Sequence, residues 1–434
     1  MMTVGVARID ITPDHPVWLS GYSSRNAPAE DVAQRIWAKA LALGGDELGE
    51  TAVLVTAESC GAPASFVDAL YQRLAAHGLK RSNLVVSWSH SHTAPWLHGF
   101  APFLAQQPVP QEHQDQRTRY EETLLDKMTQ VARQALDSRR PAQLFLAQGS
   151  VGFAANRRVL KDGRWAGFGV QADGPVDHRL PVLVAKSPTG DLLAVMANYA
   201  CHCTTLGGEF NQVCGDWSGY AQKYIEAEHP DTVALITIGC GADMNPEPRG
   251  KLEHCKQHGR AVADELNRLL AGELRPVAPA LACRSTDVDL PLDELPSIDA
   301  WREAAARNDS YGRRAKHFLR LMEQGRPLPS SISYPISVWS FGDDLAMVFL
   351  AGEVVVDFSL HISREFDPDR TWITAYANDM PCYIPSKRIL REGGYEADQS
   401  MIYYGQPTRL APQTEDIVLQ TIGALMPAQF RSNR

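Results

Sequence analysis

The sequence lacks the long apolar segments of a membrane protein. No window of its 434 residues approaches the run of about 20 predominantly apolar residues that a transmembrane helix needs. The N-terminus, from Met1 to Asp10, also has no basic start followed by an apolar stretch of signal-peptide length. We therefore expect no integral membrane segment and a cytoplasmic location.

Clusters of positive charge are missing as well. The chain has 42 Lys and Arg against 51 Asp and Glu, a formal net charge of -9, and no Lys/Arg run. This balance argues against a surface that binds polyanions, so we expect no nucleic acid among the partners. With 44% hydrophobic and 21% charged residues, the chain has the composition of an ordinary globular protein with room for one large domain or two.

Cysteine is too sparse for a disulfide framework. The eight cysteines are scattered along the chain, which predicts reduced thiols, and they are Cys60, Cys201, Cys203, Cys214, Cys240, Cys255, Cys283 and Cys382. The Cys-x-Cys spacing at 201 and 203 is too short for a usual structural zinc site, and no second pair matches it. We expect most of these cysteines to be small buried packing residues.

What the sequence does contain is an alternation of short apolar strands with longer amphipathic segments, which predicts an α/β fold. The expected strands are 4–11, 52–56, 83–88, 143–148, 181–186, 191–199, 232–238, 333–341 and 345–350. The expected helices are 63–77, 119–138, 219–228, 251–271, 415–425 and a segment from Gly352-Glu353 to about 366. Residues 52–88 thus resemble a strand-helix-strand crossover, which gathers ligands beyond the carboxyl ends of its strands.

Residues 286–332 differ from the rest, with several prolines and a highly charged helical stretch from Trp301 to Glu323. The strand pattern resumes after them. We predict a helical insertion at about 286–332 within a single domain that spans residues 1–434.

Two histidines stand out at His90 and His92, directly after the apolar run Leu84–Trp88. In a strand, residues i and i+2 point to the same face, so both imidazoles would project into one space. This arrangement suits a metal site or an acid/base pair. The alternative is that one or both histidines are ordinary polar residues at the end of a strand. A catalytic zinc ion needs about three protein ligands, so further ligands must come from elsewhere in the chain.

Other chemically capable side chains follow apolar runs in the same manner. His202 comes after the strand 191–199, and Glu353 comes after the run Ala346–Leu350. A glycine-rich turn at 239–246 and a tyrosine-rich loop at 376–396 add backbone amides and hydroxyl groups. The tyrosines are either surface anchors or hydrogen-bond donors to a reacting oxygen.

Taken in order, these segments resemble the neutral/alkaline non-lysosomal ceramidase family over nearly the whole chain. His90-Ser91-His92-Thr93-Ala94-Pro95 is similar to its His-Thr-His-Ser/Thr-x-Pro element. The other similar segments are Val6–Pro13 with Gly21-Tyr22, Asn198–Thr205, Gly215–Tyr220, Gly352-Glu353, Tyr383 and Tyr395-Glu396.

The resemblance implies a zinc-dependent amidohydrolase with a multilayer mixed sheet core flanked by helices. Its metal ligands carry over as His90, His202, Glu353 and Tyr383. It also implies that metal-activated water attacks an amide carbonyl, with His92 as the proton carrier and with Arg157 and Tyr395 as donors to the carbonyl oxygen. For Arg157, a salt-bridging arginine is the alternative.

Two departures from the family pattern bear on the substrate. Asn245 stands in Ala242–Pro246 where the family has a serine; an amide hydrogen-bonds but is no nucleophile, which favours the metal-water route and puts ceramide in doubt. Secreted family members also carry a signal peptide and a C-terminal β-sandwich, which this chain does not show. We therefore expect a soluble small-molecule amide as substrate, and we expect the apolar segment 96–104 to line its pocket rather than the core.

Two other readings stay open at this point. The chain could hydrolyse another ester or lactone bond, or it could be a non-catalytic ligand-binding member of the fold. The four predicted metal ligands favour catalysis, because a binding protein has little need to keep them together. The sequence leaves open whether the chain forms a homo-oligomer.

Overall fold

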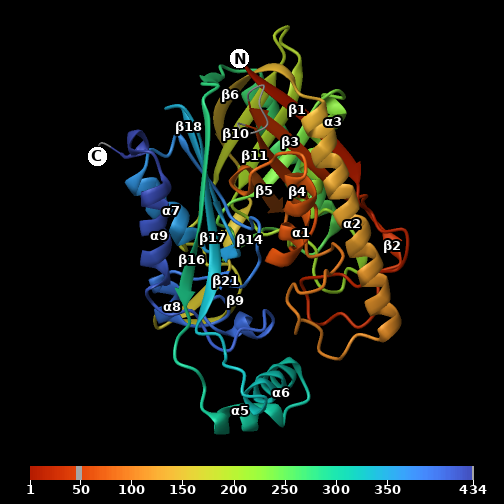
Figure 1. Cartoon of the computed structure of the whole chain (residues 1–434), viewed down its shortest axis with the longest axis vertical. Helices are drawn as coiled ribbons and strands as arrows, with labels where there is room; N and C mark the ends of the chain where they lie inside the picture. Colours follow the sequence, from red (N-terminus) through yellow and green to blue (C-terminus); the bar gives the residue numbers. More distant parts are fainter. Residues whose placement is uncertain (45–50, 433–434) are drawn as a thin grey trace.

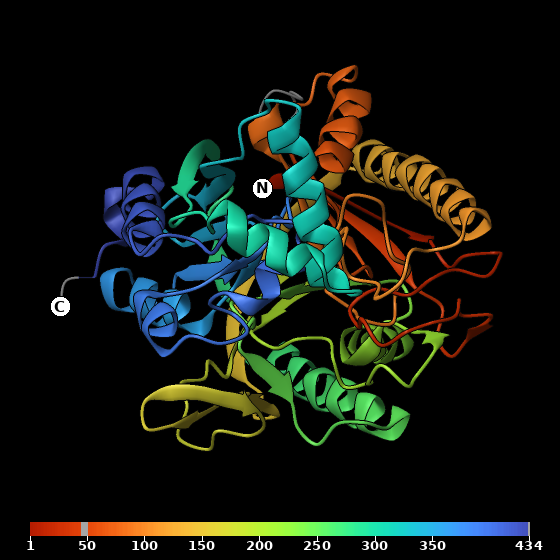
Figure 2. The same cartoon turned by 90° about the horizontal axis from the view of Figure 1, so that it is seen from below.

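Two β-sheets pack face to face between layers of helices in the computed structural model, which describes residues 1–44 and 51–432 (Figures 1 and 2). The large sheet has the order β13-β11-β10-β6-β1-β3-β4-β5, with β15 paired to β6. Its strands are β1 (Met2–Asp10), β3 (Trp37–Gly44), β4 (Ala52–Ala57), β5 (Leu84–Trp88), β6 (Arg140–Ser150), β10 (Arg179–Lys186), β11 (Leu192–Tyr199), β13 (Val233–Ile238) and β15 (Arg275–Val277).

The second sheet has four strands in the order β16-β17-β18-β20, namely β16 (Leu281–Pro291), β17 (Ser331–Phe341), β18 (Leu345–Leu350) and β20 (Thr371–Thr374). Both sheets are mixed: β4 with β5, β11 with β13 and β18 with β20 are parallel, and the other pairs are antiparallel. The parallel β4–β5 pair with helix α1 (Ala64–Ala75) between its strands is the predicted crossover. The mixed α/β architecture predicted from the sequence is therefore confirmed.

Alternating apolar residues give each sheet two buried faces. Along β18, Met347 and Phe349 belong to the core between the two sheets, whereas Val348 and Leu350 belong to the core beneath the helices. The same period of two in β4 places Leu54 between the sheets and Val55 under the helices. Since both faces are covered, the strands read as continuous apolar runs.

Helices form the outer layers. The large sheet is covered by α1, α2 (Gln111–Asp137), α3 (Asp216–Glu228) and α4 (Leu252–Leu270), while α7 (Val356–Glu365) and α9 (Thr414–Leu425) lie beside the small sheet (Figure 1). The remaining helical segments are α8 (Lys387–Glu392), η2 (Arg81–Asn83), η3 (Gln399–Ile402) and η4 (Ala428–Phe430). No helix in the described part of the chain is long and apolar enough to cross a membrane.

Short strand pairs complete the fold. They are β2 (Asp31–Val32) with β12 (Gln212–Val213), β7 (Ala154–Asn156) with β14 (Met244–Pro246), β8 (Arg158–Lys161) with β9 (Arg164–Phe168), and β19 (Glu353–Val354) with β21 (Tyr383–Ile384). All eight cysteines are free, and all except Cys283 are buried, as expected from the sequence.

The predicted helical insertion corresponds to the tip of the β16–β17 hairpin. These strands pair from Leu281 to Pro291, so only residues 292–330 lie between them. Two helices, α5 (Ile298–Ala305) and α6 (Ser310–Glu323), replace the single charged stretch, because Asp309 caps the start of α6 by accepting a hydrogen bond from the Gly312 amide. Trp301, Ala315 and Phe318 give this region a small core of its own.

Other element boundaries also differ from the prediction. Helix α2 begins at Gln111 rather than at 119, since its first two turns are polar and carry little periodic signal. Glu353 does not open a helix: it lies in the short strand β19, and α7 begins at Val356.

Candidate active site

The site forms where the carboxyl ends of parallel strands meet. His90 follows β5, His202 follows β11, and Glu353 follows β18. Strands β13 and β5 stand at opposite ends of the hydrogen-bonded order of the large sheet, yet they are in contact, as are β11 and β20 of the two sheets. This curvature brings together side chains that are far apart in the sequence.

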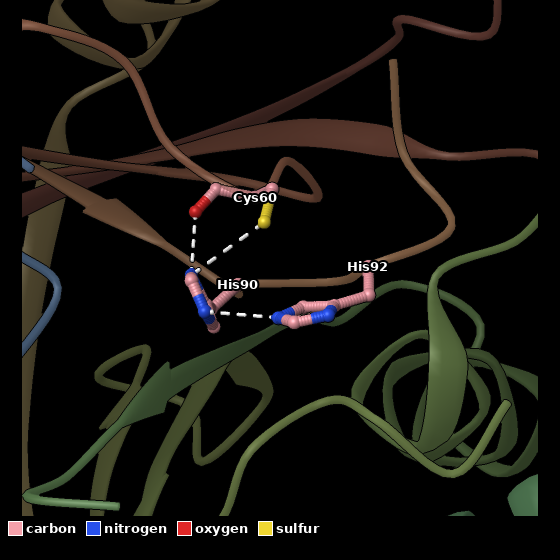
Figure 3. A group of neighbouring side chains, drawn as sticks. All are labelled: Cys60, His90 and His92. Carbon is pink, nitrogen blue, oxygen red and sulfur yellow. Dashed lines mark hydrogen bonds between the residues drawn. The ribbon is translucent and has the colours of Figure 1, made fainter. Parts of the chain in front are cut away.

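His90 and His92 meet by a different route from the one predicted. Strand β5 ends at Trp88, and His90 has the left-handed backbone angle φ 56°, so the two residues do not share a strand face. The sharp turn at His90 instead points both rings into one space, with their Nε2 atoms 3.1 Å apart (Figure 3). The proximity was predicted correctly, but its geometric reason was wrong.

Three of the four predicted metal ligands converge on one carboxylate oxygen. Oε2 of Glu353 lies 3.1 Å from Nε2 of His90 and 2.9 Å from Nε2 of His202. The fourth, Tyr383, has its hydroxyl 3.4 Å from Nε2 of His202. All four side chains are buried, so the oxygen and nitrogen atoms that converge here are shielded from bulk water.

Contacts behind the ligands fix which ring nitrogen faces the centre. Nδ1 of His90 donates to the Cys60 carbonyl at 2.6 Å, and Nδ1 of His202 donates to the Gly241 carbonyl at 2.7 Å. Each imidazole then directs Nε2 inward, which is the usual arrangement of metal-ligating histidines. The other oxygen of Glu353 accepts a hydrogen bond from Tyr404. Two imidazoles and a carboxylate held in this way fit a divalent metal such as zinc.

The electrostatics favour the protonation states that a metal requires at His202 and Glu353 but not at His90. Burial opposes the charge of His90, but Cys60 and Glu353 hold its pKa well above the usual value, so a metal must replace its Nε2 proton. Burial, with help from the nearby Arg157 guanidinium, lowers the pKa of His202 to about 4, so this imidazole is neutral. Burial opposes the ionisation of Glu353, but His90 and His202 together hold its pKa well below the usual value. Burial raises the pKa of Tyr383 well above its usual value, and the Glu353 charge adds to this effect. Tyr383 is therefore a neutral phenol here.

Cys60 forms a second group with His90 and His92, which sequence reasoning missed (Figure 3). Its sulfur lies 3.7 Å from Nδ1 of His90, on the side of the ring whose proton is already donated to the Cys60 carbonyl. A metal between these atoms would need that proton removed. The group with Glu353 and His202 is thus the better metal site.

Arg157 is buried and donates hydrogen bonds to three side chains around the site. Its Nε donates to Glu396 at 2.8 Å, its Nη2 donates to the Tyr383 hydroxyl at 3.1 Å, and its Nη1 donates to Oδ1 of Asn245 at 3.4 Å. Thr204 also donates to that Oδ1, at 3.1 Å. With its oxygen engaged twice, Asn245 has its amide N–H groups left to donate.

His92 is held in place from behind by two residues near the N-terminus. Arg25 donates to its backbone carbonyl at 2.7 Å, and Gly21 leaves room for the ring, since a Cβ there would lie 2.2 Å from Cγ of His92. Burial and the neighbouring His90 and His202 lower the pKa of His92 well below its usual value. The imidazole of His92 is therefore neutral in this structure.

A pocket of about 270 Å³ opens beside the two histidine segments. Among its lining residues are the predicted His92, Arg157, Asn245, Tyr383 and Tyr395, and the remaining ones are Gly21, Tyr22, Ser23, Leu104, Phe168, Thr204, Arg249 and Tyr403. The ring of Tyr395 packs edge-on against Tyr383, with centroids 5.5 Å apart. All eight predicted site residues therefore lie around one centre.

The apolar segment 96–104 divides between the pocket and the core. Leu104 lines the pocket. Trp96, Leu97 and Phe100 are buried in the main core, so the expected role in the pocket is wrong for most of this segment. Apolar composition alone does not distinguish the two roles.

Comparison with known proteins places this chain in a family. A model of the neutral/alkaline non-lysosomal ceramidase N-terminal domain matches residues 2–263. The chain belongs to this family. The resemblance seen in the motifs is thereby confirmed, and the chain is a member of a hydrolase family. Comparison with curated proteins gives no match.

Solved structures agree in fold. The neutral ceramidase from Pseudomonas aeruginosa superposes with a TM-score of 0.75 at 16% identity, over 97% of this chain and 73% of that one. A ceramidase described as complexed with C2 superposes with a TM-score of 0.72 at 16% identity, over 96% of this chain and 74% of that one. At this identity, the likeness establishes the fold.

Proposed function

We propose that this protein is a zinc-dependent hydrolase that cleaves the amide bond of an N-acyl amide. The observation that carries the proposal is the meeting of two Nε2 atoms, from His90 and His202, at one oxygen of Glu353 within 3.1 Å. Tyr383 completes the proposed ligand set, with its phenol oxygen next to His202. A zinc ion held there supplies Lewis acidity toward a water molecule and toward the amide carbonyl.

The chain's own groups divide the remaining work. His92 lies at the pocket wall as a neutral imidazole, and we assign to it the transfer of a proton from the attacking water to the departing amine. Arg157, Asn245 and Tyr395 line the same wall with N–H and O–H donors, and we assign to them the stabilisation of the negative charge that develops on the carbonyl oxygen. Because an amide side chain is not a nucleophile, Asn245 favours attack by water.

The pocket also bears on the size of the substrate. Its volume of about 270 Å³ is at the lower end of ordinary small-molecule sites. Its wall combines Leu104, Phe168 and tyrosine rings with the polar groups of Arg157, Asn245 and Thr204, so an apolar acyl group can lie beside the amide. The small volume supports a short amide over ceramide.

Metal analysis and an amide panel test the proposal together. Purified protein should contain about one equivalent of zinc, and it should release amine from short N-acyl amides in a reaction that a chelator stops and zinc restores. His202→Ala should lose the metal and the activity. The matched control is His229→Ala, because His229 bonds Asn267 between α3 and α4, outside the site.

The outcomes separate the alternatives. Absence of metal from the wild type, with His202→Ala unchanged in stability and activity, would contradict the site. Bound zinc without turnover of any amide, ester or lactone would indicate a ligand-binding member of the family. Turnover of ceramide ahead of short amides would reject the soluble substrate.

A further inference from the structure

Arg249 is the one lining residue of the pocket whose charge the catalytic assignment does not use. It follows β14 and lies on the same pocket as His92 and Asn245. One of its N–H groups donates to the Tyr22 hydroxyl at 3.1 Å, and that hydroxyl donates in turn to the Leu206 carbonyl at 2.9 Å. Since a guanidinium has five N–H donors, most of those on Arg249 are left to a ligand.

The charge of Arg249 is only partly balanced inside the described part of the chain, by the buried Asp216, whose pKa burial raises and Arg249 lowers in part. No carboxylate among residues 1–44 and 51–432 forms an ion pair with it, whereas Arg157 across the pocket pairs with Glu396 at 2.8 Å. No described aspartate or glutamate lines the pocket either. A protein with a formal net charge of -9 thus has a positively charged pocket wall.

The backbone around Arg249 is fixed to the core on both sides. The amide of Gly250 donates to the Thr205 carbonyl at 2.6 Å, and the amide of Glu247 donates to the Phe153 carbonyl at 2.8 Å. A cation on such a support is preorganised, so little ordering is needed when an anion binds. A surface arginine on a free loop would not have this property.

Resting on the proposed function, we propose that the substrate is an anionic amide, with a carboxylate near the scissile bond that Arg249 binds, as in an N-acyl amino acid. The planar guanidinium matches a carboxylate through two parallel hydrogen bonds. In the reaction, water adds its hydroxyl to the acyl carbon and a proton to the nitrogen as the C–N bond breaks. The products are a carboxylic acid and a free amino acid.

Two matched probes test this assignment. N-hexanoyl-alanine carries a carboxylate, and N-hexanoyl-alaninol carries a neutral hydroxymethyl group in its place. The wild type should show a kcat/KM at least about tenfold higher for the anionic probe, and this preference should decline with added salt. Arg249→Gln should raise KM for N-hexanoyl-alanine about 10- to 100-fold and leave N-hexanoyl-alaninol unchanged, with Arg249→Lys in between.

Lys251→Gln is the control for net charge. Lys251 is exposed two residues away, and its side chain makes no cap hydrogen bond to α4. Lys251→Gln should leave kcat/KM unchanged for both probes. Calorimetric binding of N-hexanoyl-alanine to chelator-treated protein gives a readout that does not depend on turnover, and Arg249→Gln should weaken that binding by a similar factor.

The anionic substrate and the amide hydrolysis can be contradicted separately. Equal turnover of both probes by the wild type, or equal KM values for wild type and Arg249→Gln, would overturn the anionic substrate while leaving amide hydrolysis intact. If neither probe is hydrolysed, the proposed function fails, and calorimetry then tests Arg249 alone. Loss of N-hexanoyl-alanine binding in Arg249→Gln supports the carboxylate site. Binding that is absent from the wild type, or unchanged in Arg249→Gln, overturns it.

Discussion

Gly21 offers a test of His92 that does not touch the histidine itself. A Cβ at Gly21 would lie 2.2 Å from Cγ of His92, and Gly21 has φ 87°. Gly21→Ala should therefore displace the ring and lower kcat by about 100-fold or more, the usual contribution of a positioned proton carrier. Zinc content should not change, because His92 is not among the proposed ligands.

Gly163→Ala is the control that separates the displacement of the His92 ring from the effect of backbone strain. Gly163 also has a positive φ of 73°, but its Cβ would meet no atom within 4 Å. Gly163→Ala should lower the stability of the protein and leave kcat per folded molecule unchanged. Loss of zinc from Gly21→Ala, measured by metal analysis, would argue that His92 is a ligand.

Glu58 makes the stability of the protein depend on pH. Burial raises its pKa to about 7, an effect that Lys39 opposes in part, while Trp37 and Gln222 donate hydrogen bonds to its carboxylate. A raised pKa means that the folded state holds the proton more tightly, so the contribution is full below the unfolded pKa and is lost as pH rises through 7. A shift of this size corresponds to about 3 kcal/mol.

Urea unfolding at a series of pH values measures this dependence. Between pH 4.5 and pH 8, the free energy of unfolding of the wild type should include a loss of about 3 kcal/mol that Glu58→Gln does not show. The difference between the two proteins at each pH isolates Glu58 from other titrating groups. Parallel curves would contradict the raised pKa.

The sequence motifs singled out residues that the structure brings together. His90, His202 and Glu353 each follow an apolar run, and the ends of these runs meet although they belong to two sheets. Their role as metal ligands stays a prediction. Cys60 and Tyr404, which orient His90 and Glu353, were missed. Cys60 acts through its backbone carbonyl, which any residue could provide, so its identity carries no signal.

Helix α6 of the hairpin tip supports the pocket from outside. Arg313 donates to the carbonyls of Ala105 and Gln106, next to the pocket residue Leu104, and Arg314 donates to the Gln406 carbonyl at 2.8 Å. Arg313→Ala should therefore loosen residues 103–106, seen as faster amide hydrogen exchange there, and raise KM several-fold with kcat retained. Arg320→Ala, on an exposed position of the same helix, is the control. Unchanged exchange in Arg313→Ala would show that α6 does not hold this segment.

Elements were predicted better in type than in extent. Buried strands such as β13 and β18 were found almost to the residue, because their apolar runs end abruptly. The polar start of α2 and the break between α5 and α6 were missed, since capping by Asp309 overrides a continuous charged pattern. The order of the large sheet was out of reach, because β6 pairs with β1, β10 and β15 through contacts that no local pattern encodes.

At the scale of the whole molecule, the proposed metal ligands come from both sheets. His90 and His202 follow strands of the large sheet, whereas Glu353 follows β18 of the small one. An ion bound by all three would link two layers that also meet through apolar packing and through hydrogen bonds, such as the one that Asn198 donates to the Ile373 carbonyl at 2.7 Å. Metal binding should therefore stabilise the entire fold and not the site alone.

Thermal unfolding with and without a chelator measures this link. Binding to the folded state alone contributes about 4 kcal/mol when free metal is 1,000-fold above its dissociation constant, so the chelator should lower the Tm of the wild type by several degrees. In Glu353→Gln the Tm should no longer respond to the chelator, because the carboxylate shared by both histidines is gone. Glu365→Gln removes a surface carboxylate that pairs with Arg431, and it should keep the full response. A wild-type Tm that does not respond to the chelator would mean that no metal joins the two sheets.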